Sequence, residues 1–104
     1  MTLEELALRL KTTDLPVTYR AWPEDGDVPP LPYICYLGTD TDGVFADGGV
    51  YFSWENVRVE LYTALKDPAL EKTVEEALRG FHWKKSETYI DTERCYLILY
   101  EIEV

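Results

Sequence analysis

Residues 55–81 read ENVRVELYTALKDPALEKTVEEALRGF, and this stretch decides the fold. In its first part Val57, Val59 and Leu61 alternate with polar residues, and this period of two predicts a strand with one buried face. In its second part the apolar residues recur at helical spacing instead. The segment therefore predicts a strand, a tight turn and an amphipathic helix that bury their apolar sides in one core. The residues of the helical stripe are Leu70, Val74, Ala77, Leu78 and Phe81.

Local signals mark the ends of this helix and predict another helix near the N-terminus. Asp67 can accept hydrogen bonds from amides of the first helical turn, and Pro68 has no amide to leave unpaired there. Gly80 suits the left-handed backbone conformation that ends many helices. The run Thr2–Glu5 matches a capping box, so we expect residues 3–11 to form a short helix.

The remaining apolar runs predict strands on both sides of the second helix. Together they give the order α-β-β-β-α-β-β, which is typical of an α+β fold. We expect a single domain, residues 1–104, with a mostly antiparallel sheet of about four to five strands and two helices on one face. The expected strands are an edge strand at 15–20, a central strand at 32–37, a strand at 50–54 that runs into 56–62, an exposed strand at 82–90 and a last strand at 93–104.

The last strand is apolar on both faces. Ile98 and Tyr100 share one face, whereas Leu97 and Leu99 lie on the other. Two explanations remain open: the strand is covered on both sides, or its second face meets another subunit. Trp22 lies in a Pro-rich, loop-like segment and is a further candidate for an interface.

The formal net charge is -10, and the acidic residues are spread along the chain. Such a surface repels phosphate backbones, so we expect no sequence-specific binding of nucleic acid. The charge fits either simple solubility or a surface that stays close to DNA without binding it. No apolar run could span a membrane, and the N-terminus does not resemble a secretion signal, so a cytoplasmic site of synthesis is expected. Cys35 and Cys95 are then expected to be buried free thiols.

Candidate catalytic and metal-binding residues are few. His82 is the only histidine, and no phosphate-binding loop, nucleophile elbow or zinc-type cluster accompanies it. The sequence Asp40-Thr41-Asp42-Gly43, with Asp47 beyond it, partly matches a calcium loop but lacks its terminal glutamate. We expect residues 38–43 to form a polar loop instead, because a turn rich in Asp and Gly explains the same residues without a metal. We therefore expect no enzyme activity, no cofactor and no metal.

Several short motifs nevertheless resemble a family of small prophage proteins from the head–tail joining region of tailed phages of Gram-positive bacteria. The similarity covers nearly the whole chain and is weakest at residues 22–30. The motifs are Met1–Leu6, Phe45–Asp47, Val50–Tyr51, Val59–Thr63, Lys66–Glu71, Glu87–Ile90 and Tyr100–Ile102.

This resemblance implies a structural role in tail termination or tail completion. Proteins of this kind form a ring, typically of six subunits, which caps the tail tube and faces the head connector. The implied partners are other copies of the chain, the tail tube and the connector, and the implied locations are the virion and, during assembly, the host cytoplasm. The residues we assign to the interface are Trp22, Leu97 and Leu99, with the acidic pair Asp40 and Asp42. The alternative is an acidic adaptor or inhibitor that binds a basic protein, as a DNA mimic would.

Overall fold

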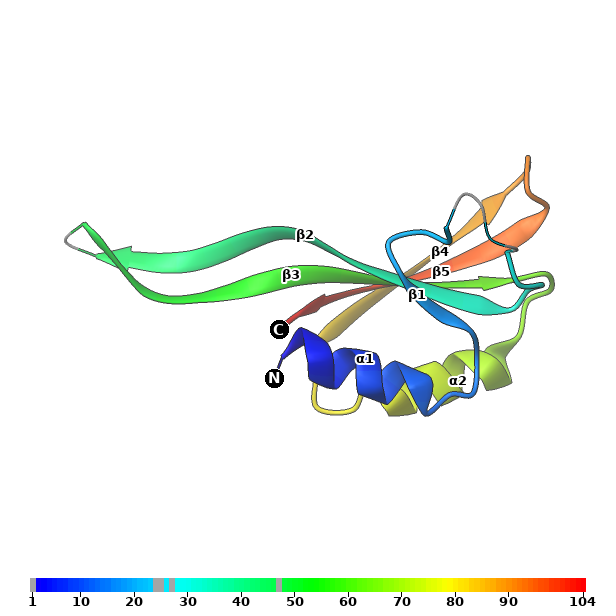
Figure 1. Cartoon of the computed structure of the whole chain (residues 1–104), viewed down its shortest axis with the longest axis horizontal. Coiled ribbons are helices and arrows are strands. Elements are labelled where there is room, and N and C mark those ends of the chain that lie inside the picture. Colours follow the sequence, from blue (N-terminus) through cyan, green and yellow to red (C-terminus); the bar gives the residue numbers. More distant parts are fainter. Residues whose placement is uncertain (1, 24–25, 27, 47) are drawn as a thin grey trace.

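Two helices and five strands are present in a computed structural model of the chain, which describes residues 2–23, 26, 28–46 and 48–104 (Figure 1). The predicted α+β class and the predicted order of elements are confirmed. The elements are α1 (Leu3–Lys11), β1 (Val17–Tyr19), β2 (Tyr33–Ala46), β3 (Gly49–Thr63), α2 (Pro68–Ala77), β4 (Trp83–Ile90) and β5 (Cys95–Glu103).

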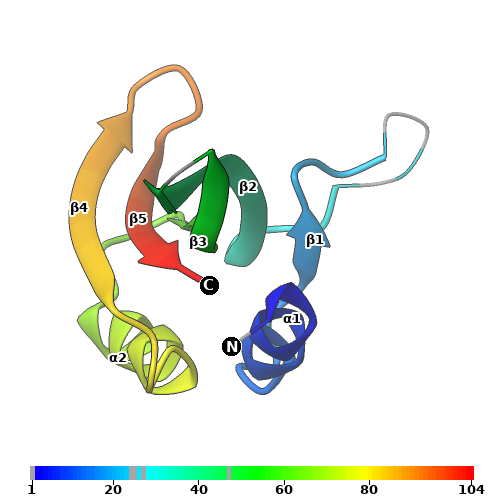
Figure 2. The same cartoon turned by 90° about the vertical axis from the view of Figure 1, so that its left-hand side faces the viewer.

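The five strands form one sheet in the order β1-β2-β3-β5-β4. The neighbouring strands are antiparallel except for the short edge strand β1, which runs parallel to β2. Both helices lie on the same side of the sheet (Figure 2). The molecule therefore has two layers, and one sheet face has no helix over it in the described part of the chain.

The capping signals act as the sequence predicts. The Thr2 hydroxyl accepts a hydrogen bond from the Glu5 amide at 3.2 Å. The Asp67 carboxylate accepts one from the Leu70 amide at 3.1 Å, and Pro68 begins α2. Gly80 follows the helix with φ of 93°, a conformation that costs glycine little. Each helix therefore begins with a side chain that satisfies a backbone donor of its first turn.

The core lies between the helices and the covered face of the sheet. In the strand register Ile34, Leu61 and Ile98 form one row, and Tyr100 lies opposite Val59 in the next. These side chains contact the apolar stripes of both helices, so one hydrophobic cluster joins the two layers. Of the residues that the helical and strand periods assign to this core, Leu70 is half-buried and nine are buried: Val57, Val59, Leu61, Val74, Ala77, Leu78, Phe81, Ile98 and Tyr100.

The strand β2 is longer than the sequence predicts, whereas β3 agrees with the predicted strand that runs from residue 50 to residue 62. The prediction of a polar loop at residues 38–43 is wrong, because Asp40 pairs with Asn56 and Asp42 pairs with Trp54 in the β2–β3 ladder. The β5 side of β3 ends at Glu55, which exchanges two backbone hydrogen bonds with Val104, so residues 49–54 of β3 have β2 as their neighbour on one side and no segment of the described chain bonded on the other. We call this two-stranded extension, residues 39–46 and 49–54, the arm. It projects from the body along the long axis of the molecule (Figure 1).

Candidate functional site: the uncovered sheet face and the arm

The uncovered face of the sheet carries a cluster of half-buried apolar and aromatic side chains. Strand alternation places Leu97 and Leu99 on this face, as predicted, while Ile98 between them is fully buried on the other. Leu97 lies opposite Tyr62, which lies opposite Tyr33 on the next strand. We call this cluster the apolar patch, and its residues are Trp22, Tyr33, Tyr62, Leu97 and Leu99.

Trp22 reaches the patch from the segment between β1 and β2. Its ring packs edge-on against Tyr33 with a centroid distance of 5.5 Å, and Tyr33 packs against Tyr62 at 5.3 Å. Edge-to-face and tilted pairs of this kind add to the stabilisation that burial alone provides. The structure therefore brings together three of the five predicted interface residues, Trp22, Leu97 and Leu99.

The patch is uncharged at neutral pH. Burial is the main factor that raises the pKa of the Tyr33 and Tyr62 hydroxyls, and the charge of Glu60 adds to the shift at Tyr62. Burial also raises the pKa of the Cys35 thiol to about 11, with Glu60 again contributing. Cys35 and Cys95 are both buried free thiols. All of these groups keep their protons, so the patch offers apolar contact rather than reactive chemistry.

One ion pair lies beside the patch on the same face. The Arg58 guanidinium lies 3.7 Å from the Glu60 carboxylate, which also accepts a hydrogen bond from the Tyr62 hydroxyl at 3.0 Å. The two charges are of opposite sign, so their local effect largely cancels. The centre of the uncovered face therefore has little net charge, although the protein as a whole is strongly acidic.

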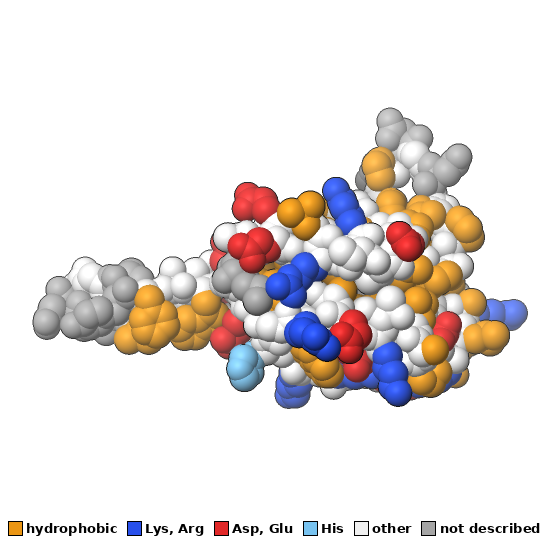
Figure 3. Space-filling view, turned by 90° about the horizontal axis from the view of Figure 1, so that it is seen from below, with side chains coloured by type: hydrophobic (Ala, Val, Ile, Leu, Met, Phe, Trp, Pro, Cys, Tyr) orange, Lys and Arg blue, Asp and Glu red, His pale blue; other side chains and the backbone are white. Residues whose placement is uncertain are grey.

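One side of the arm carries the apolar residues Val44, Phe52 and Trp54 and, nearer the base, Asp42, which lies opposite Trp54. Val44 lies opposite Phe52 in the ladder, and the rings of Phe52 and Trp54 are 5.6 Å apart. Phe52 is 59% exposed and Val44 is 42% exposed. The opposite side of this ribbon carries Ser53, which is also exposed and lies opposite Gly43. In the view of Figure 3 charged side chains gather over the body, whereas the arm shows hydrophobic and uncharged atoms beyond its base.

Asp40 and Asp42 lie at the base of the arm and not in the apolar patch. The side-chain amide of Asn56 donates hydrogen bonds to both carboxylates, at 2.7 Å to Asp40 and 2.8 Å to Asp42. The predicted interface residues thus fall into two groups. One group lies in the apolar patch (Trp22, Leu97 and Leu99), and the other lies at the base of the arm (Asp40 and Asp42). Asp47 of the same acidic run is outside the described residues.

An open pocket of about 940 Å³ crosses the sheet where the arm leaves the body. His82 and Lys84 line it together with Asp40, Arg58 and Glu101. His82 is exposed, and the mixed charges around it have no arrangement typical of a nucleophile with a positioned base. Among residues 2–23, 26, 28–46 and 48–104, no three His, Cys, Asp or Glu side chains are grouped so as to hold a metal ion. No helix in the same residues has the length and apolar character needed to cross a membrane.

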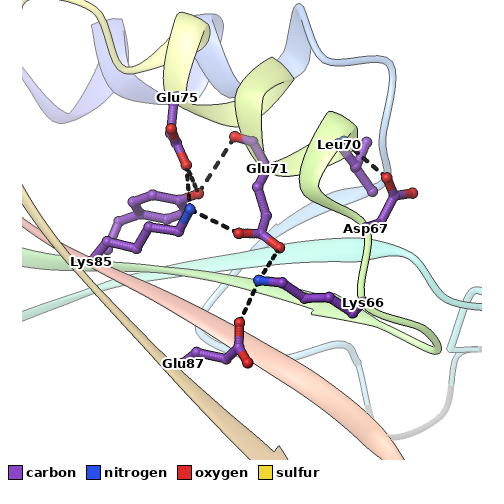
Figure 4. A network of polar contacts seen from close by, with 8 residues as sticks. Lys66, Asp67, Leu70, Glu71, Glu75, Lys85 and Glu87 are labelled. Atoms are coloured by element: carbon purple, nitrogen blue, oxygen red, sulfur yellow. Dashed lines mark hydrogen bonds and ion pairs between the residues drawn. The ribbon is translucent and has the colours of Figure 1, made fainter.

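A charged cluster joins α2 to β4, and sequence reasoning missed it (Figure 4). The buried carboxylate of Glu71 lies 2.6 Å from the Lys66 ammonium and 2.7 Å from that of Lys85. Lys85 also pairs with Glu75 at 2.7 Å, and the Tyr100 hydroxyl donates a hydrogen bond to Glu75 at 2.8 Å. The only signal in the sequence is the position of Glu71, seven residues before Leu78 and therefore on the apolar side of α2.

Burial and pairing act on Glu71 in opposite directions. Burial favours the neutral acid, but the hydrogen bonds and charges of Lys66 and Lys85 outweigh it and lower the pKa of this carboxyl. Glu71 is therefore ionised at neutral pH and stabilises the contact between α2 and the sheet. We assign this cluster a role in the fold.

A scan of protein-family models finds none that matches this chain, and a search of curated proteins finds no match either. The resemblance to small prophage proteins thus stays a prediction from the residues that carry it.

Proposed function

We propose that this protein is a non-enzymatic structural subunit that closes into a ring and ends the tail tube of a long-tailed phage or prophage at the head–tail junction. The proposal combines the resemblance of the sequence with one structural observation. In the part of the chain that the structure describes, helices cover one face of the sheet, and the other face carries the apolar patch of Trp22, Tyr33, Tyr62, Leu97 and Leu99. A half-covered sheet with an apolar centre is typical of a surface that meets another protein.

The acidic composition supports a position beside passing DNA. Twenty acidic residues stand against ten basic ones, and four of the lysine and arginine side chains already pair with carboxylates of the same chain: Arg58, Lys66, Arg79 and Lys85. Phosphate groups find few free cations on such a surface, so DNA would slide along it without being held. This is the property that a ring at the end of a DNA channel requires.

Sedimentation velocity of the wild type and of Leu97→Glu tests the proposal. We expect the wild type to associate as its concentration rises from about 1 µM to about 1 mM, and Leu97→Glu to remain monomeric because a charge in the patch must be desolvated on contact. Circular dichroism should show the same fold for both. Electron microscopy of the concentrated wild type should show closed rings.

Leu8→Glu is the matched control, because Leu8 is 65% exposed on α1, away from the uncovered face. It adds the same charge and should associate like the wild type. An unfolded Leu97→Glu beside a folded Leu8→Glu would assign Leu97 to the core and contradict the interface. A wild type that is monomeric at every concentration would contradict the ring.

The second candidate is an acidic adaptor that binds a basic protein, and the net charge of -10 favours it. The dependence of association on salt concentration distinguishes the two candidate functions. Copies with the same charge repel one another, so added salt should strengthen self-association, whereas it should weaken binding to a basic partner. Association that falls steeply with added salt in a mixture with a basic protein, without self-association, would support the adaptor.

A further inference from the structure

The strand β4 forms one outer edge of the sheet, and this edge is long. All eight residues of Trp83–Ile90 pair with β5, and no segment of the described chain pairs with the other side of the strand. In Figure 2 β4 is the outermost strand on its side of the sheet. The edge strand on the opposite side, β1, has three residues. A free edge as long as that of β4 is a template for a further strand.

The protection of this edge depends on charged side chains. Natural edge strands are also protected by proline, by bulges or by a covering segment, but β4 contains no proline and its register with β5 has no shift. Lys84, Lys85 and Glu87 give β4 a formal charge of +1, and no other helix or strand of the described chain has a positive sum. Copies of a protein with a net charge of -10 therefore repel one another least at this edge.

Two copies of β4 can pair antiparallel in few registers. Backbone groups that point outward recur at every second residue and must lie opposite each other, so a two-fold axis passes through a residue and not between two residues. Two such registers pair seven residues of β4, either 83–89 with the axis at Ser86 or 84–90 with the axis at Glu87. The second register places Glu87 opposite its own copy. In the first, Lys84 lies opposite Thr88, and no like charges are opposite.

The register with its axis at Ser86 also creates two favourable kinds of pair. Lys85 lies opposite Glu87 of the second copy, and Trp83 lies opposite Tyr89. Opposite charges and aromatic rings in such positions stabilise the pairing of strands. Trp83 is 39% exposed and Tyr89 is 47% exposed, so both rings have surface left to contact. Lys85 and Glu87 already pair within the chain, but their side chains are 33% and 44% exposed and can take a further partner.

We propose that the β4 edges of two copies of this chain pair antiparallel around a two-fold axis at Ser86. This contact goes beyond the proposed ring, because a two-fold pair closes on itself and uses an edge outside the apolar patch. It is one strand wide and joins two acidic molecules, so the pair is weak, with a dissociation constant above about 1 mM. Leu97→Glu therefore still sediments as a monomer up to that concentration, and the pair must be detected by trapping.

Disulfide trapping measures the register directly. Ser86→Cys places a thiol on the two-fold axis, opposite the same thiol of the second copy and within the Cα distance that a disulfide spans. Thr88→Cys is the matched control, because it lies on the same face of β4 but its two copies would be about 13 Å apart along the strands. Both sites are exposed, whereas the native thiols of Cys35 and Cys95 are buried.

The rate of dimer formation under mild oxidation is the result that decides. We expect Ser86→Cys to form a covalent dimer at least about tenfold faster than Thr88→Cys, after each rate is divided by the reaction rate of that thiol with a small disulfide reagent. Non-reducing electrophoresis measures the dimer. Equal rates would mean random collision and would overturn the proposed register, as would the absence of a dimer from both variants. The ring is reported separately by electron microscopy of the wild type.

A mixture of two variants tests the same register away from its axis. Lys84→Cys and Thr88→Cys lie opposite each other in the proposed pair, so their mixture should form mixed dimers at least about tenfold faster than either variant forms a dimer with itself. Mass spectrometry distinguishes the three products. Products in random proportions would overturn the pairing. Shifts of the β4 amide resonances on addition of a peptide of alternating Thr and Glu, without trapped dimers, would assign the edge to an acidic partner instead.

Discussion

The covered and uncovered faces of the sheet are built from alternate residues of the same strands, yet they have different partners. On β5, Ile98 is fully buried under the helices, while its neighbours Leu97 and Leu99 are half-buried on the other face. Both faces are apolar, so hydrophobicity alone does not distinguish a core from an interface. The difference lies in the cover that the described residues provide: two helices lie over the first face, whereas on the second Trp22 packs against Tyr33 and no helix is present.

The largest loss of stability is expected from a substitution on the covered face of the sheet. Leu78→Ala removes a fully buried side chain from the contact of α2 with the sheet and should destabilise the protein by about 2–5 kcal/mol. Thermal unfolding followed by circular dichroism measures the loss. Leu8→Ala, at a site that is 65% exposed, is the control and should change the melting temperature little. Equal melting temperatures for Leu78→Ala and the wild type would mean that the apolar stripe of α2 is assigned wrongly.

The next largest loss of stability is expected in the charged cluster between α2 and β4. Glu71→Gln leaves the ammonium groups of Lys66 and Lys85 without this carboxylate, and we expect a loss of about 1–3 kcal/mol at neutral pH, reduced by the partial exposure of both lysines. Urea denaturation measures it. Glu76→Gln is the control, because its side chain is 69% exposed on the same helix.

The stability lost in Glu71→Gln should decrease as the pH is lowered. Pairing lowers the folded-state pKa of this carboxyl below its ordinary value of 4.5, so the stabilisation is complete above that pH and disappears as the pH falls through the folded-state pKa. The wild type and Glu71→Gln should therefore converge in stability in acid. A difference that grows as the pH is lowered would contradict the assigned ion pairs.

A smaller effect is expected one residue away from the core, at Leu97. Its side chain is half-buried, so Leu97→Ala should cost about 1 kcal/mol in the monomer, against about 2–5 kcal/mol for Ile98→Ala. Both are measured at low protein concentration, where association does not contribute. Equal losses for these adjacent substitutions would mean that the second face is as well covered as the first.

The smallest effect on stability is expected in the arm. Phe52 is 59% exposed and contacts Trp54, so Phe52→Ser should change the free energy of unfolding by less than about 0.5 kcal/mol. Denaturant titration of the dilute protein checks this. A large loss would show that the arm belongs to the folding unit of the body and is not a free extension.

The sequence predicts the body and the β3 half of the arm better than the β2 half of the arm, and the reason is physical. Capping residues such as Asp67 act over one helical turn, and a buried face imposes a period of two or 3.6 on the residues that form it. The arm has no core beneath it, so no apolar period marks residues 40–43 as a strand. Their Asp and Gly content is typical of turns, but pairing with β3 and the two hydrogen bonds from Asn56 keep them extended.

The sequence indicates part of what lies on the uncovered face. Alternation along the last strand places Leu97 and Leu99 on the face opposite Ile98, and Trp22 is marked by its Pro-rich, loop-like context; their role in an interface stays a prediction. The aromatic contacts of Tyr33 with Trp22 and Tyr62 depend on strand order, which residue spacing does not specify. The same holds for Lys66, Glu71 and Lys85, which lie on three different segments and meet only when α2 packs on the sheet.

The strands β2 and β3 pass from the body into the arm without interruption, and a register shift between Gly38 and Asp40 marks the point where they leave it. A bulge of this kind bends a strand and increases its twist. In the proposed ring, this bend would set the direction in which the arm of each copy leaves the body. The outline of the assembly would then depend on a few backbone angles near Gly38.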